Sequence, residues 1–206
     1  MRFYSSVLSW SFSNGMEAYV LPRPGGTVMV ECYIRTGSIH EGEQLGCGLS
    51  HFLEHMLFQG CRNYPGTSAA DTLQNAGCQI NAYTSFDRTV YHSRGAGDKL
   101  PLMLDVLSSM IRYPELPEKR FIAERDVILR EYDRTRDDPG RRLQEELFKL
   151  MYLRHPMRVP VIGQRDMIAE VTAQMAADLK MAAVFTQEFG MAVKQTTISL
   201  QQLNIL

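Results

Sequence analysis

The sequence carries almost no net charge and few cysteines. Its 22 basic and 23 acidic residues leave a net charge of −1, so nothing favours general binding to nucleic acid or to an anionic membrane surface. The four cysteines, Cys32, Cys47, Cys61 and Cys78, stand apart without any Cys-x-x-Cys pair. In a chain of 206 residues we expect free thiols rather than a disulfide framework, and therefore a reducing compartment.

Long hydrophobic runs and targeting segments are also lacking in the sequence. No apolar stretch approaches the roughly 18 residues that a membrane-spanning helix needs. The first residues, MRFYSSVLSWSFSNG, are interrupted by serines and lead to no small-residue cleavage site. We therefore expect an intracellular, cytoplasmic protein without a membrane partner. With 45% apolar residues, no internal repeat and no linker, residues 1–206 are expected to fold as one domain.

Hydrophobic periodicity predicts strands mainly in the first half of the chain and helices mainly in the second. Asn14 and Gly15 favour a hairpin within residues 3–22, and the alternating apolar residues of VMVECYIRTGS indicate a half-buried strand. Two more strands, CQINAYTS and RTVYHSR, follow around a turn near Phe86. Helices are predicted at residues 48–59, 69–76, 98–110, 117–136, 141–153 and 171–184. This order predicts an α+β fold in which a mainly antiparallel sheet packs against helices on one side.

The most informative segment is SHFLEHMLF, which lies in a predicted helix. Positions i, i+3 and i+4 share one face of a helix, so His51, Glu54 and His55 project to the same point. Two histidines one turn apart can bind one Zn²⁺ ion, and a carboxylate between them can accept a proton from water. A catalytic zinc site usually has three protein ligands, so a third one is expected elsewhere. His40 and His92 are candidates, but each stands alone in the sequence.

The predicted helix over residues 117–136 offers carboxylates for that third position. Glu124 and Glu131 are seven residues apart and therefore lie on one face, two turns from each other. Asp126 and Asp133 form a second pair with the same spacing, about 160° away around the helix. Only one pair can face the histidines, and the spacing alone does not choose between them.

His-x-x-Glu-His is the inverted order of the zincin motif, and two further segments follow it: PGTSAADTLQNAGCQINAYTSFDRTVYH and ERDVILREYD. Together they resemble the N-terminal catalytic domain of the M16 metallopeptidases over about residues 13–165. The resemblance implies a zinc-dependent endopeptidase that hydrolyses unstructured peptides or short protein segments. It further implies that His51, His55 and Glu131 hold the Zn²⁺ cofactor.

The resemblance also assigns roles to two more carboxylates and to the segment NAYTS. It implies Glu54 as the general base and Glu124 as the carboxylate that supports the site. NAYTS is implied as an edge strand to which an extended substrate peptide adds, with Asn81 and Ala82 at the substrate-binding positions. The alternative is that Asn81 is only a polar residue at the start of a strand.

M16 enzymes contain two or four homologous domains, in one chain or in paired subunits. The resemblance therefore implies a peptide substrate and a second M16-type domain or subunit, in a homo- or hetero-oligomer. The alternative is a non-catalytic subunit with an assembly or scaffold role, but such relatives typically lose motif residues that this chain keeps. Residues 175–206 match no family pattern, and we expect a truncated or frameshifted reading frame there.

Overall fold

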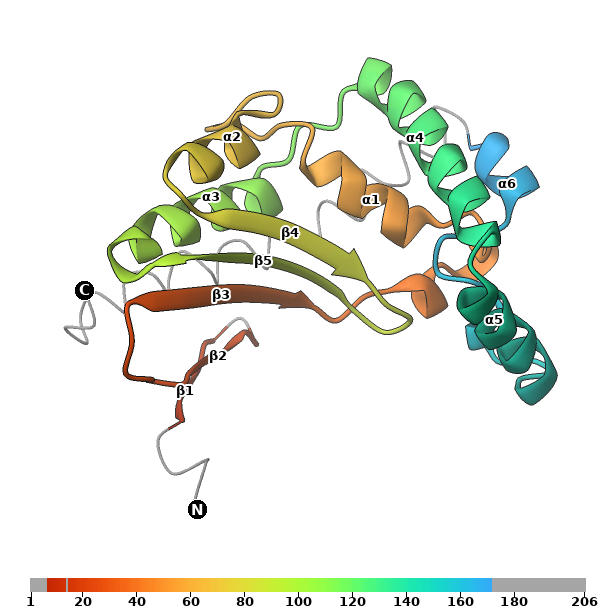
Figure 1. Cartoon of the computed structure of the whole chain (residues 1–206), viewed down its shortest axis with the longest axis horizontal. Coiled ribbons are helices and arrows are strands. Elements are labelled where there is room, and N and C mark those ends of the chain that lie inside the picture. Colours follow the sequence, from red (N-terminus) through yellow and green to blue (C-terminus); the bar gives the residue numbers. More distant parts are fainter. Residues whose placement is uncertain (1–6, 14, 172–206) are drawn as a thin grey trace.

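Three antiparallel strands form the main sheet of the protein (Figure 1). The computed structural model describes residues 7–13 and 15–171, and β5 (Thr89–Ala96) lies at the centre of this sheet. It pairs with β3 (Thr27–Ile34) on one side and with β4 (Gln79–Thr84) on the other. Strand β4 is therefore an edge of the described sheet.

Six α-helices accompany the strands within the described part of the chain (Figure 1). They are α1 (Leu49–Leu57), α2 (Ser68–Asn75), α3 (Leu100–Arg112), α4 (Glu118–Arg136), α5 (Pro139–Met151) and α6 (Arg165–Ala169). The first five are the helices predicted up to residue 153, with ends shifted by one or two residues. The short helix α6 was not predicted, and the helix predicted at 171–184 lies outside the described residues, as does the atypical segment 175–206.

Among the residues that the structure describes, helices cover the main sheet on one face only, which confirms the predicted α+β architecture. Cys32 and Ile34 of β3 point inward with Tyr91 of β5, and they pack against α1 and α3. On the opposite face, Tyr33 and Tyr83 are 48% and 40% exposed. Buried and exposed side chains alternate along each strand because successive side chains of a strand point to opposite faces of the sheet. None of the helices in the described ranges is long and apolar enough to cross a membrane.

The predicted hairpin near the N-terminus is present, but it forms a sheet of its own. Strands β1 (Leu8–Ser11) and β2 (Glu17–Val20) pair in antiparallel register apart from the main sheet. Gly15 supplies the positive φ of 83° that the turn needs. Arg35, just after β3, donates a hydrogen bond of 2.8 Å to Glu17 and so ties the hairpin to the main sheet.

Helix α1 lies between the main sheet and α4, so it can join groups from both (Figure 1). Phe52 of α1 stacks on Phe121 of α4, with their ring centroids 4.2 Å apart. Ile128 of α4 and Ile168 of α6 belong to the same buried cluster. This apolar contact sets the distance between α1 and α4 and thus between the polar residues beside it.

All four cysteines are free thiols, as the sequence predicts, and the structure shows that all four are buried. Burial raises the pKa of Cys32 to about 12, so its thiol stays protonated at neutral pH. The cysteines act as small apolar side chains in the packed interior.

Candidate metal centre

Helix α1 begins at a glycine in a conformation that other residues rarely adopt. Gly48 has a φ of 67°, and a Cβ atom at this position would overlap the carbonyl oxygen of Ile162. In the first turn, the backbone N–H of Ser50 donates a hydrogen bond of 2.8 Å to the carboxylate of Glu41. These contacts fix where α1 starts and therefore the direction in which its side chains point.

Two histidines of α1 project together toward α4. His51 and His55 are one helical turn apart, and their ring centroids lie 4.7 Å from each other. Their side chains are only 12% and 20% exposed. The spacing in the sequence predicts this arrangement, because residues four apart are neighbours on a helix surface.

Glu131 of α4 reaches both histidines. Its Oε2 atom lies 3.7 Å from Nε2 of His51 and 3.5 Å from Nε2 of His55. Ligand atoms around one tetrahedral zinc ion lie roughly 3.3–3.5 Å apart, given bonds of about 2.0–2.1 Å. The three ligand atoms of this cluster all lie within 4.8 Å of one another. The cluster therefore fits a metal ion held by three protein ligands.

The other candidates for the third position lie elsewhere. Asp126 and Asp133 are exposed on α4, and Asp133 pairs with Arg165 at 3.0 Å. Of the two pairs with seven-residue spacing, the structure brings the glutamates to the histidines. His40 is exposed next to the start of α1, and His92 lies on β5, so neither joins the cluster.

Glu124 contacts the side of His55 that faces away from Glu131. Its Oε2 atom lies 3.1 Å from Nδ1 of His55, and its Oε1 atom accepts a hydrogen bond of 2.7 Å from the side-chain amide of Gln59. A carboxylate on Nδ1 holds the ring so that Nε2 is free for a metal ion. Sequence reasoning missed Gln59, although it follows His55 by one helical turn.

The surroundings give the two histidines different pKa values. Burial lowers the pKa of His51 to about 4, so this imidazole is neutral, the form that binds a metal ion. Burial also acts to lower the pKa of His55, but hydrogen bonds to Glu124 and Glu131 outweigh it and raise the pKa to about 9. The bond to His55 in turn lowers the pKa of Glu131. A metal ion bound here would displace the proton of His55.

Glu54 lies on α1 beside the cluster and is 9% exposed. Burial raises the pKa of its carboxyl group, although Thr84 of β4 donates a hydrogen bond of 2.6 Å to Oε2 and acts to lower it. A raised pKa is favourable for a group that accepts a proton and later returns it. Sequence reasoning also missed Thr84, which is the last residue of the edge strand.

Asn81 and Ala82 lie in the middle of β4, the edge strand of the described sheet. The Asn81 side chain is exposed, and its Oδ1 atom accepts a hydrogen bond of 2.9 Å from the backbone N–H of Ala82. The backbone N–H of Ala82 therefore has its hydrogen-bond partner within β4 and not on a neighbouring strand. Tyr83 beside it is exposed, whereas Tyr91 is part of the core.

Comparisons with known proteins agree with this fold. The model of the insulinase family, peptidase family M16, matches residues 21–165. An uncharacterised zinc protease of Bacillus subtilis, YmxG, is 31% identical over 164 residues, which cover 79% of this chain and 40% of that protein. The mitochondrial-processing peptidase subunit beta of Neurospora crassa is 30% identical over 146 residues, which cover 71% of this chain and 30% of the relative.

Solved structures show the same relationship. A protease from Helicobacter pylori superposes with a TM-score of 0.75 at 27% identity, over 82% of this chain and 41% of that one. An inactive peptidase M16 domain from Pseudomonas fluorescens, 21% identical with a TM-score of 0.72 over 84% of this chain and 42% of that one, shares the fold.

The chain belongs to peptidase family M16 and corresponds to an N-terminal domain of that family. It is thus a member of a family of metalloproteases, with a cluster of two histidines and a glutamate that can hold a metal ion. The chain spans two fifths or less of the length of the curated relatives reported above.

Proposed function

We propose that this chain is the catalytic unit of a zinc-dependent endopeptidase that hydrolyses unstructured peptides or short protein segments. The convergence of His51, His55 and Glu131 beside a buried Glu54 carries the proposal. In this proposal those first three residues hold a zinc ion. When bound, zinc supplies a Lewis acid that polarises the scissile carbonyl group and lowers the pKa of a water molecule.

In this proposal, the side chains around the cluster transfer the proton and hold the reacting groups in position. Glu54 accepts the proton of the attacking water and returns it to the amine nitrogen of the leaving group. Thr84 donates to one oxygen of Glu54 and leaves the other oxygen for this proton transfer. Glu124, itself held by Gln59, keeps the His55 ring in the orientation that presents Nε2 to the metal position.

We propose that the substrate peptide lies along β4, with Asn81 and Ala82 among its contacts. The edge of β4 supports this, since an extended peptide can add to an open strand through main-chain hydrogen bonds. In this arrangement the Ala82 amide exchanges its local bond to Asn81 for a substrate carbonyl. Main-chain binding requires an extended segment, which explains the expected preference for unstructured substrates.

We also propose that a second M16-type domain or subunit completes the enzyme. Two observations support it: the chain spans only 30–40% of its relatives, and an apolar surface is exposed along α5. Leu143, Leu150 and Leu153 on and just after this helix are 72%, 78% and 80% exposed. Apolar residues clustered on one surface are typical of a protein interface, and the second domain is the occupant we assign to it.

A peptidase assay with a matched variant tests the proposed function. The chain is incubated with a quenched, unstructured peptide, alone and together with a second M16-type subunit from the same source. We expect hydrolysis that stops with a chelator and returns with zinc. Glu54→Gln should retain zinc but lose activity by about 10²–10⁴-fold, with Glu43→Gln, an exposed glutamate, as the control. A zinc-loaded pair without hydrolysis would instead support the non-catalytic, assembly-type alternative.

A further inference from the structure

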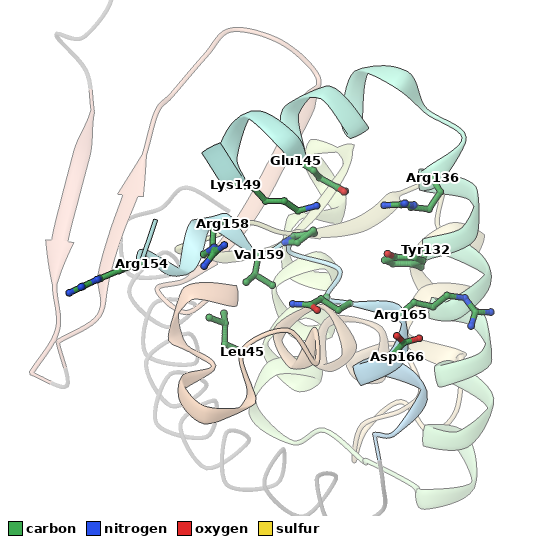
Figure 2. Close-up of a pocket in the computed structure, with 13 residues that line it drawn as sticks. Leu45, Tyr132, Arg136, Glu145, Lys149, Arg154, Arg158, Val159, Arg165 and Asp166 are labelled. Carbon is green, nitrogen blue, oxygen red and sulfur yellow. The ribbon is translucent and has the colours of Figure 1, made fainter. Parts of the chain in front are cut away.

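A hollow whose charged lining residues are mostly basic lies between α4, α5 and the segment that leads into α6 (Figure 2). Its volume is about 650 Å³, which is within the usual range for small-molecule sites. Five of its lining residues are cations: Arg136, Lys149, Arg154, Arg158 and Arg165. Two are acidic, Glu145 and Asp166. None of the residues of the metal cluster lines this hollow, which we call the basic pocket.

The cations of the basic pocket differ in the direction in which they point. Figure 2 shows Lys149 of α5 and Arg136 of α4 extending toward one another, with the carboxylate of Glu145 beside them. Arg154 points away from the pocket in the same view. Lys149 and Arg136 therefore point into the pocket, whereas the side chain of Arg154 does not.

The cations also differ in their partners. Arg165 is paired with a carboxylate of α4, and Lys149 with a neighbouring carboxylate of its own helix. Arg136 and Arg158 form no ion pair with any residue that the structure describes. One Nη atom of Arg158 donates instead to a backbone carbonyl, at 3.1 Å. Two guanidinium groups of the pocket thus have donors left for a ligand.

We propose that the basic pocket binds a small oxyanion, either a phosphate or a dicarboxylate. Five cations line the pocket, against two carboxylates of the lining and two more that pair with Lys149 and Arg165, so one positive charge is in excess. The guanidinium groups of Arg136 and Arg158, which have no ion pair among the described residues, supply the donors that the ligand would meet. Guanidinium groups bind phosphate and carboxylate oxygens through paired N–H donors, and a partly enclosed site strengthens these charge-assisted bonds. An oxyanion neutralises this excess.

The basic pocket and the metal centre lie on different sides of α4. Arg136 follows Glu131 by five residues, which is a rotation of about 140° around a helix. A ligand in the pocket therefore need not contact the metal cluster. Its binding does not depend on the proposed peptidase activity, and a test of binding can fail or succeed independently of that activity.

Titration calorimetry at low salt tests the basic pocket. The zinc-loaded chain is titrated with inorganic phosphate and, separately, with succinate. We expect Arg136→Gln combined with Lys149→Gln to weaken binding at least about tenfold. Arg120→Gln removes the same charge from an exposed arginine of α4 that does not line the pocket, and we expect less than a twofold effect. Circular dichroism checks that each variant is folded, and Arg136→Gln alone replaces the double variant if that one unfolds.

The outcomes separate the two ligand sources and decide the proposal. Tighter binding of phosphate identifies a phosphorylated ligand, tighter binding of succinate a dicarboxylate, and either supports an oxyanion site. Raising the salt concentration should weaken binding, because the attraction is electrostatic. No heat of binding up to about 10 mM of either anion overturns the proposal, as does binding that the Arg136 variants leave unchanged.

Discussion

Thr84 on the edge strand donates a hydrogen bond of 2.6 Å to Glu54 on helix α1. This bond joins the strand proposed to bind the substrate to the residue proposed to move the proton. It connects two elements that are 30 residues apart in the sequence. A substitution at Thr84 in the edge strand can therefore alter the proton transfer proposed for Glu54, because the two residues are joined by this hydroxyl group.

The bond gives a pH-dependent prediction. Because the Thr84 hydroxyl stabilises the charged form of Glu54, Thr84→Val should raise the pKa of this carboxyl group further. The acidic limb of the rate profile should then move to higher pH, and kcat should fall about tenfold. Thr84→Ser retains the hydroxyl group and should restore the wild-type profile. An unchanged acidic limb in Thr84→Val would show that this bond does not tune Glu54.

Zinc stoichiometry tests the third ligand. We expect Glu131→Ala to lose tightly bound zinc, because only two histidines then remain at the cluster. Asp126→Ala, on the same helix but exposed, should bind zinc as the wild type does. Metal content after dialysis measures both variants. Full zinc retention in Glu131→Ala would reject this residue as a ligand.

Zinc binding should also release a proton. His55 has a pKa of about 9 and is protonated at neutral pH, whereas His51, with a pKa of about 4, is already neutral. Binding at pH 7 should therefore release about one proton, and the apparent affinity should rise up to about tenfold per pH unit until pH 9. Calorimetry in two buffers with different ionisation enthalpies measures the number of protons released.

A variant of the supporting carboxylate provides the control for proton release. Glu124→Gln removes one of the three carboxylates that raise the pKa of His55, so fewer protons should be released near pH 8. Zinc affinity should fall about 10–100-fold, as is usual when the partner of a metal-binding histidine is lost. An affinity that is independent of pH in the wild type would contradict the assigned charge of His55.

The contact between α1 and α4 predicts a stability difference between adjacent residues. Phe121 is 3% exposed and stacks on Phe52, so Phe121→Ala should lower the free energy of unfolding by about 3–5 kcal/mol. Ile122, the next residue, is 54% exposed, and Ile122→Ala should change the free energy of unfolding by less than about 1 kcal/mol. Urea unfolding measures both. Equal losses would mean that this stack does not hold the helices together.

The two faces of α1 could be predicted from the sequence because helical geometry fixes them. The choice between the glutamates and the aspartates of α4 could not, since both pairs have the same spacing. A further pattern was available: Phe121 and Ile128, both buried, precede the glutamates by three residues and the aspartates by five. Residues three apart share a helix face and residues five apart do not, so packing turns the glutamates toward α1.

Contacts between distant segments were beyond sequence reasoning. Thr84 and Gln59 carry no motif, and their roles follow from the way β4, α1 and α4 pack together. The basic pocket is likewise assembled from α4, α5 and the loop before α6, where no single run of charge is unusual. The separate N-terminal hairpin also depends on tertiary packing, because local patterns do not specify which strands share a sheet.

The position of β4 at an edge of the described sheet has a consequence for the behaviour of the protein in solution. Its sequence, QINAYT, has neither proline nor a charged residue, the usual features that keep sheet edges from pairing with one another. An edge that binds extended peptides in the way proposed above does not distinguish a substrate from another copy of the chain. Discrimination must then come from controlled access to the strand, and an unguarded β4 would be where self-association begins.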